Sequence, residues 1–495
     1  MRRPSPHLLP AVVLLLAGLA GCPTVDTDDD TDTETTDTDA DTDTDTDGDA
    51  DIVPSADHYR FPSRGDASVD SVSYDGQVFR NLLIEDMKIH IGGLTSRLDG
   101  GFFPAAGDVR GELEFYFEFD SATSGTLPIG FDPGTAVQAT YDDVSTEKDL
   151  VGKIAGNDAV GQHVDWSTGF VGWADPAVTT PESLVRHWFD TLDAQAVDWS
   201  IGTYPLDPSG APVPAVYLTS DGRDLQQLLQ KFLGGAVSFS QGADDYLDDD
   251  EPGKGLLSDH SVLEAGEPYT ALEHAWDEGF GYFGAARAYP SFTDAVIASP
   301  GYADVDGDAV IDLHSEVCWG HSTNSAKRDL GASPSAPTDL TADAWAGFWE
   351  GRALLASTSG ALTPAELDTL RQHRNTALDA WEKAIGATIV HYVNDVLKDM
   401  GRFDTPDYVF ADHAKHWSEL KGFALALQFN PHSPVSDGDF ATLHGLIGQA
   451  PVLPSADAPT RAAYAEDLRA ARVLLGTAYG FDPANLGDAD GQNGW

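Results

Sequence analysis

Seven segments between residues 184 and 479 repeat apolar residues at spacings of three and four. This spacing gathers the apolar side chains on one face of an α-helix, which must then be buried against neighbours. The segments are Leu184–Leu192, Asp224–Phe239, Tyr269–Tyr289, Ala342–Ser357, Pro364–Met400, His413–Leu427 and Thr460–Tyr479. Thr363, Pro364 and Glu366 supply a helix start, with a capping hydroxyl, a first-turn proline and a glutamate three residues after the cap. We therefore expect a mainly α, multi-helix, bundle-like domain with long loops and little β structure.

The region from Tyr59 to Phe119 gives mixed signals. Phe79–Ile91 is compatible with an amphipathic helix, whereas Val69–Tyr74 and Glu112–Phe119 alternate in the manner of strands. We expect mostly helix and loop here, with a single strand at most. The loops 202–214, 242–259 and 430–439 are long for a helical bundle, and long loops of this kind often carry function.

The N-terminus has the pattern of an export signal. Arg2 and Arg3 precede the apolar run Leu8–Leu19, which is short for a membrane span. The run ends in Leu-Ala-Gly-Cys22, which resembles the lipobox of bacterial lipoproteins; the alternative is an ordinary signal peptide with an incidental cysteine. The resemblance implies a lipid anchor at Cys22. The residue after Cys22 is Pro23 rather than aspartate, so the known sorting rules for lipoproteins imply that the protein goes to the outer membrane. They do not indicate which leaflet it occupies.

A tract of aspartate and threonine follows the cysteine. It holds fourteen acidic residues between Asp26 and Asp51 and no large apolar side chain. Such a segment cannot bury enough surface to offset its ordering entropy, and its charges repel one another. We expect a signal peptide over residues 1–21, a lipidated cysteine and disordered tether over 22–52, and one helical domain over 53–495. Calcium condensation on the tract is an alternative to a plain spacer.

Acidity extends beyond the tether. The whole chain has 28 basic and 81 acidic residues, and residues 52–495 keep a balance of −41 from 67 acids and 26 basic residues. This charge argues against binding to nucleic acid or to anionic headgroups and favours cations as partners. With Cys22 lipidated, Cys318 has no intramolecular partner, so no disulfide framework is expected.

The most specific motif in the expected domain is an acidic loop. Carboxylates alternate along Asp304–Asp312, so a turning loop can direct several at one calcium ion. The loop departs from the EF-hand pattern, because glycine falls at its fourth position instead of its sixth and its twelfth position is serine. An acidic connecting loop without an ion is the alternative. The predicted ligands are Asp304, Asp306, Asp308, the Val310 carbonyl, Asp312 and Glu316.

Two further segments combine histidine with acids at helical spacing. His274 shares a helix face with Asp277 and Glu278, and His416 shares one with His413 and Glu419. Two such helices lying side by side could hold a transition metal. Buried histidines that hydrogen-bond to carboxylates in a core give the same pattern, so both interpretations stay open.

Several stretches together resemble a bacterial family catalogued as domain of unknown function 4856 (DUF4856), found largely in exported lipoproteins. The resemblance extends from about Tyr59 to Trp495 and implies no established activity. A weaker likeness is to imelysin-type helical proteins, some tied to iron and some described as peptidases. His416 and Glu419 fit their H-x-x-E motif, but Ala414 stands where the fuller motif has glycine. The stretches that carry the family resemblance are Tyr74–Gln77, Gly253–Asp259, Glu273–Gly284, Lys327–Asp329 and His416–Pro431.

The motifs of common enzyme classes do not occur: there is no H-E-x-x-H, G-x-S-x-G, phosphate-binding loop or C-x-x-C. Three functions stay open. The first is a membrane-anchored binding protein that uses calcium, with or without a second metal; the second is a metal-dependent hydrolase, and the third a structural or adhesive module. Acidity and the tether favour binding over catalysis, with the protein or small-molecule partner unspecified.

Overall fold

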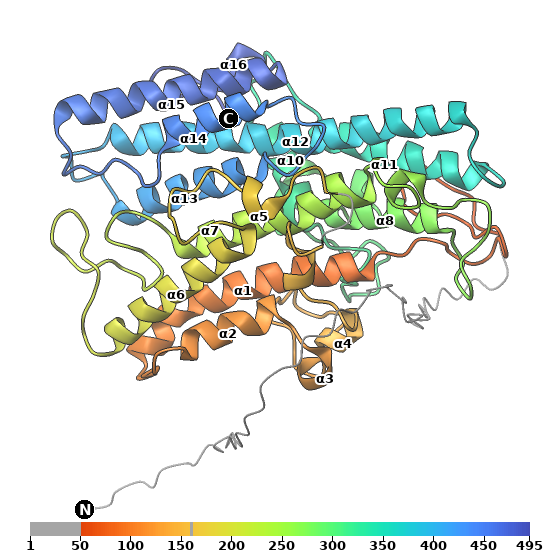
Figure 1. Cartoon of the computed structure of the whole chain (residues 1–495), viewed down its shortest axis with the longest axis horizontal. Helices are drawn as coiled ribbons and strands as arrows, with labels where there is room; N and C mark the ends of the chain where they lie inside the picture. The colour runs from red at the N-terminus through yellow and green to blue at the C-terminus, as the bar shows by residue number, and fades with distance from the viewer. Residues whose placement is uncertain (1–50, 159–161) are drawn as a thin grey trace, which may run out of the picture. The chain divides into compact units, whose positions relative to one another are not determined.

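The longest helix that the computed structural model describes is α12 (Pro364–Met400), with 37 residues; the described residues are 51–158 and 162–495 (Figure 1). Its start is the predicted one: Thr363 accepts a hydrogen bond from the N–H of Glu366, whose side chain bonds back to Thr363. Four helices pack along α12. They are α10 (Gly320–Gly331), α11 (Leu340–Ser357), α13 (Phe410–Ala426) and α15 (Ala458–Tyr479).

The remaining long helices surround this group. The N-terminal helix α1 packs on α7, α8 and α2, while α6 packs on α2 and α14 packs on α15. The bounds are α1 (Asp75–Asp99), α2 (Asp108–Phe117), α6 (Pro181–Ser200), α7 (Leu225–Leu233), α8 (Ala271–Phe283) and α14 (Asp437–Ile447). One buried apolar core runs through all of them, so the described residues form a single compact unit.

Short helical elements fill the connections. The α-helical ones are α3 (Ser121–Ser124), α4 (Tyr141–Val144), α5 (Trp166–Gly169), α9 (Asp294–Ala298) and α16 (Pro483–Leu486). The 3₁₀ turns are η1 (Val151–Lys153), η4 (Gly255–Leu257) and η5 (Tyr289–Ser291), and η2 (Gly234–Phe239) and η3 (Gly242–Tyr246) are π-helical. The mainly α fold is confirmed. In the part of the chain that the structure describes, β pairing is limited to isolated bridges.

The structure differs locally from the sequence expectations in three places. Glu112–Phe119 lies mostly in α2 because Val109, Leu113 and Phe117, four residues apart, are all buried. The predicted helix Tyr269–Tyr289 ends earlier, at Phe283, because Gly284 takes a left-handed conformation with φ +85°. The helix predicted over Asp224–Phe239 changes from α to π at Gly234.

The predicted signal sequence, the predicted lipidation site Cys22 and nearly all of the predicted tether lie outside the described residues. Within residues 51–158 and 162–495, no helix combines the length and apolar character needed to cross a membrane.

Candidate functional site

The acidic loop predicted to bind calcium lies between α9 and α10 and brings three of its predicted ligands together. Asp304, Asp306 and Glu316 each offer a carboxylate oxygen, and these oxygens lie within 4.8 Å of one another. Asp304 and Asp306 are exposed, whereas only 6% of Glu316 is exposed. The group therefore has a buried carboxylate at its base and two on the solvent side.

Backbone N–H groups orient these carboxylates. Asp304 accepts hydrogen bonds from the N–H of Gly307 at 2.6 Å and of Ala309 at 2.9 Å. Glu316 accepts from two backbone N–H groups of the same loop at 2.6 and 2.9 Å. A carboxylate has about four lone-pair sites, so each keeps capacity to coordinate a cation. Burial, together with the negative charge of Asp306, raises the pKa of Glu316, and a bound cation would relieve that repulsion.

Two other predicted ligands of this loop, Asp308 and Asp312, have hydrogen-bond partners outside the converging group. Asp308 accepts a hydrogen bond from the N–H of Val310 at 2.7 Å and is not part of the converging group. Asp312 accepts from the Gln138 side chain at 2.8 Å and from the Ser315 hydroxyl. The sequence pattern predicted that carboxylates of this loop converge, but it could not separate those that converge from Asp312, which fastens the loop to Gln138.

The first of the two histidine groups, on α8, is engaged within the core. Asp277 is fully buried and accepts hydrogen bonds from Arg352 Nε at 2.9 Å and from the Tyr59 hydroxyl at 3.0 Å. Burial raises its pKa to about 7, although Arg352 opposes that shift. Glu278 accepts from the Gln77 side chain at 2.7 Å, and His274 Nε2 lies 3.8 Å from it.

The second group, on α13, has a different set of partners. His416 Nδ1 lies 2.7 Å from a carboxylate oxygen of Asp399, and Asp399 raises the pKa of His416 although burial opposes the shift. Glu419 lies 3.7 Å from the ammonium group of Lys231. His413 is fully buried with Nδ1 3.2 Å from the Tyr408 hydroxyl.

These two groups do not form one metal centre among the described residues, since no three of the six offer atoms within 4.8 Å of one another. The predicted grouping on each helix face is present, but α8 packs mainly on η3, α1 and α11, whereas α13 packs mainly on α7 and α12. Each face therefore meets its own neighbours. The alternative interpretation, histidines held by acids in a packed core, describes His416 and its Asp399 partner.

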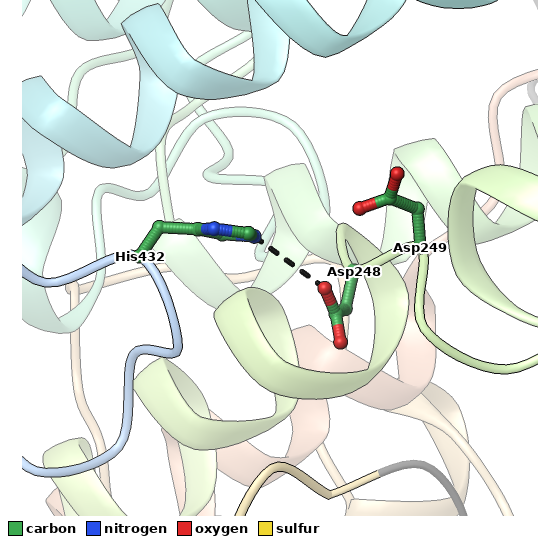
Figure 2. A group of neighbouring side chains, drawn as sticks. All are labelled: Asp248, Asp249 and His432. Carbon is green, nitrogen blue, oxygen red and sulfur yellow. Dashed lines mark ion pairs between the residues drawn. The ribbon is translucent and has the colours of Figure 1, made fainter.

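One cluster was not predicted. Figure 2 shows His432 reaching from the loop after α13 toward Asp248, with Nε2 and Oδ1 3.4 Å apart, and Asp249 beside them. Asp249 also accepts from Arg371 at 2.7 Å and lies 3.4 Å from Arg374. Two guanidinium groups thus neutralise Asp249, which makes it a poor metal ligand. Both loops were expected to carry function, but no local signal pairs residues so distant in sequence.

A pocket of 660 Å³ lies beside His432, between α12, the segment 430–434 and the end of α15. Its lining includes Glu382, of which 1% is exposed. Glu382 accepts hydrogen bonds from the Ser433 hydroxyl at 2.6 Å, the Tyr479 hydroxyl at 2.7 Å and the Asn430 side chain. Burial raises its pKa to about 7 against these three donors. The pocket thus has a polar, acidic wall that no sequence motif revealed.

Comparison with known families bears on the middle of the chain. Residues 185–308 match the family model described as Domain of unknown function (DUF4856). The predicted resemblance is confirmed over that span. No curated protein and no solved structure matches the chain.

The DUF4856 span runs from within α6 through both π-helical segments and α8 to Asp308. It therefore contains the first half of the acidic loop, whereas Glu316 and the pocket-lining Glu382 lie outside it. π-Helical turns are rare and frequently occur at functional sites. The DUF4856 description names no activity, so the site chemistry has to be argued from the residues.

Proposed function

We propose that this protein is an exported, lipid-anchored binding protein that holds a calcium ion in the loop Asp304–Glu316. The observation that carries the proposal is the convergence of carboxylates from Asp304, Asp306 and Glu316. Calcium prefers several oxygen ligands in an adaptable arrangement, and carboxylates held by backbone N–H groups provide it. The balance of −41 over residues 52–495 also raises the local concentration of cations.

The anchor is proposed from the sequence alone. The short apolar run, the small residues before Cys22 and the acidic tract after it describe a lipoprotein held at a distance from its membrane. Pro23 favours the outer membrane. In this arrangement the domain samples solvent while acyl chains at Cys22 keep it at the membrane, which suits a binding protein or a structural module.

Binding is favoured over metal-dependent hydrolysis by the partners of two candidate metal-binding acids. Asp277 pairs with Arg352 and Asp249 with two arginines. A carboxylate that is paired with a guanidinium group is a weak metal ligand.

The calcium proposal is tested by thermal unfolding of the purified protein with and without about 1 mM calcium, since a ligand that binds only the native state raises Tm by mass action. We expect a rise in Tm that is abolished in the double variant Asp304→Asn/Asp306→Asn. The matched control is Asp407→Asn/Asp412→Asn, which removes two exposed carboxylates elsewhere. Equal shifts in the two double variants would place the calcium effect outside the loop.

The anchor proposal is tested by fractionation of cells that express Cys22→Ser. The wild-type protein should stay with membranes after a high-salt wash, and the variant should move to the soluble fraction because it lacks acyl chains. A variant that stays in the membrane fraction would show that another segment holds the protein there.

A further inference from the structure

The pocket that Glu382 lines has a buried floor and an exposed rim. Its volume of 660 Å³ lies within the range of about 300–1,000 Å³ that is usual for small-molecule sites. The floor includes the buried residues Glu382, Asn430 and Tyr479, and the rim includes the exposed residues Asp343, Asp379 and His432. The described residues that line the pocket include three carboxylates and no lysine or arginine. The lining is therefore complementary to a positively charged molecule.

Glu382, on the floor, has hydrogen-bond donors but no counter-charge. The Ser433 and Tyr479 hydroxyls donate to its Oε1 atom at 2.6 and 2.7 Å, and the Asn430 side chain donates to Oε2. All three donors are neutral, and no basic residue within 51–158 and 162–495 forms an ion pair with this carboxyl group. A buried carboxylate is costly in its ionised form unless a cation pairs with it. A cationic ligand would supply that partner.

Two cations close to the lining are engaged with other acids. The Lys383 ammonium group lies 2.7 Å from a carboxylate oxygen of Asp379. Arg374 donates a hydrogen bond to the side chain of Asn375 at 2.6 Å, and its Nη1 atom lies 3.4 Å from Asp249. Neither cation therefore neutralises the floor of the pocket.

The rim contributes a second carboxylate without a counter-charge. Asp343 is exposed on α11 and forms no ion pair in the part of the chain that the structure describes. Burial, together with the charge of Asp339, raises its pKa. His432 on the same rim lies 3.4 Å from Asp248, which would balance a protonated imidazole (Figure 2). The pocket thus has one uncompensated acid at its floor and one at its rim.

Apolar groups lie between these acids in the lining. Leu378 and Ala380 of α12 are part of it. The Tyr479 ring is held against α12, because a Cβ atom added at Gly386 would lie 2.5 Å from its Cε2 atom. Phe481 stacks on the same ring with centroids 5.2 Å apart. This fixed apolar surface suits the carbon chain of an organic molecule.

A bare metal ion fits the pocket poorly. Calcium needs several oxygen ligands around one point. Two described groups bring three ligand atoms that close together, and neither contains Glu382, Asp343 or Asp379. An ammonium group differs, because it can bind to a single carboxylate through its N–H donors.

We propose that this pocket binds an aliphatic diamine, with one ammonium group on Glu382 at the floor and the other at Asp343 on the rim. A carboxylate has about four lone-pair sites, and three donors already occupy Glu382, so one site stays open to an ammonium N–H. The carbon chain lies along the apolar part of the lining. The site is separate from the calcium loop, to which none of the lining residues belongs.

Protonation of Glu382 should compete with the diamine. Burial raises the pKa of this carboxyl group to about 7, and an ammonium group pairs with its ionised form. The diamine stays charged throughout, since amine pKa values lie near about 10. Affinity should therefore fall about tenfold between about pH 8 and about pH 6. The other charged or titratable groups around the pocket are Asp343, Asp379, Lys383, His432, Tyr479 and, behind Asn375, Arg374.

The test is calorimetric titration of the full-length protein, purified in detergent, with cadaverine at about pH 8. Sodium chloride at about 150 mM screens non-specific attraction to the acidic surface. We expect saturable binding of cadaverine and none of pentanediol, its uncharged counterpart. Glu382→Gln should bind at least about tenfold more weakly, the loss expected for a charge-assisted hydrogen bond. Asp343→Asn should bind about two- to fivefold more weakly, as for an exposed ion pair.

Two controls locate the binding. Glu466→Gln removes an exposed glutamate of α15 outside the lining and should bind as the wild type does. Asp304→Asn/Asp306→Asn should do the same, because the calcium loop is a different site. Loss of binding in that double variant would place the diamine at the loop and overturn the proposal. The tenfold pH dependence of the wild type should be largely absent in Glu382→Gln, since that variant has no carboxyl group to protonate there.

Three further outcomes would overturn the proposal. They are the absence of saturable cadaverine binding, equal affinity in the wild type and Glu382→Gln, and displacement of cadaverine by about 1 mM calcium, which would make the pocket a metal site. If Glu382→Gln does not fold, unchanged affinity in Asp343→Asn together with pH-independent binding by the wild type has the same consequence.

Discussion

Ala309 occupies a backbone conformation that glycine usually provides. Its φ is +70°, at the sixth position of the acidic loop counted from Asp304. The EF-hand loop has an invariant glycine at that position because the chain turns sharply there. The methyl group of Ala309 costs roughly 1–2 kcal/mol in the left-handed region. The loop thus keeps the sharp turn with a residue that does not favour it.

We predict that Ala309→Gly raises the free energy of unfolding by about 0.5–1 kcal/mol, because relief of the left-handed strain outweighs the added freedom of the unfolded chain. Gly307 has φ +81°, and a Cβ atom added there would meet nothing within 4 Å, so Gly307→Ala should lower the same free energy by about 1 kcal/mol through backbone strain alone. Urea unfolding of the two variants measures both effects. Changes of the same sign would show that φ does not control the stability of this loop.

Glu382 is expected to make stability depend on pH. Its pKa is about 7 in the folded protein and about 4.5 when unfolded, so between these values the folded state holds a proton that the unfolded state has released. Its contribution is fully present below the lower value and is lost as the pH rises through the upper one. Between about pH 5 and about pH 8 the loss approaches about 3 kcal/mol.

Glu382→Gln removes this titrating group while keeping a similar shape. The difference in unfolding free energy between wild type and variant should therefore shift in favour of the variant as the pH rises. Urea unfolding at several pH values measures that difference, and other buried acids cancel from it. A difference that is independent of pH would mean that Glu382 stays ionised in the folded protein.

At the level of elements, α11 and α12 can approach each other closely because Gly347 has no side chain. A Cβ atom added at Gly347 would lie 2.4 Å from the backbone nitrogen of Ala377 and 2.7 Å from its Cα atom. These contacts are with backbone, which cannot rotate away as a side chain can. The two helices could accept a methyl group only by moving apart along their shared interface.

Gly347→Ala should therefore lower the free energy of unfolding by about 2 kcal/mol or more, even though alanine is the better helix former. Gly93 provides a matched control, because it is exposed on α1 and a Cβ atom there meets nothing within 4 Å. Gly93→Ala should raise the free energy by about 0.5–1 kcal/mol. Chemical unfolding of both variants gives the comparison, and equal effects would contradict the close-packing argument.

At the level of the whole molecule, the described residues fold against a large charge imbalance. The balance of −41 over residues 52–495 repels itself in the compact state, although many individual acids are paired or cap helices. Screening by salt weakens repulsion between exposed charges that are farther apart than the Debye length. The thermal stability of the protein should therefore increase with the concentration of a salt whose ions bind to no specific site on it.

We predict that Tm rises as sodium chloride increases from about 10 mM to about 300 mM, where the Debye length shortens from about 30 Å to below 10 Å. Calorimetry or fluorimetry across that range measures the effect. A fall in Tm would show that attractive ion pairs outweigh the net repulsion. The calcium effect is separable, because about 1 mM calcium changes the ionic strength very little.

The features that the sequence determined are those that depend on residues close together along the chain. The start of α12 at Thr363, the helical class of the fold and the convergence within Asp304–Glu316 all follow from hydrogen bonds or spacings over a few residues. These features can be predicted from the sequence because the interactions that produce them join residues only a few positions apart. The same logic correctly grouped His416 with Glu419 on one helix face.

Partners across the fold were decided by the tertiary structure alone. Asp277 meets Arg352 of another helix, and His432 meets Asp248 from a loop far away in sequence. A helix face specifies which side chains it presents, but packing of the whole core decides which neighbour they meet.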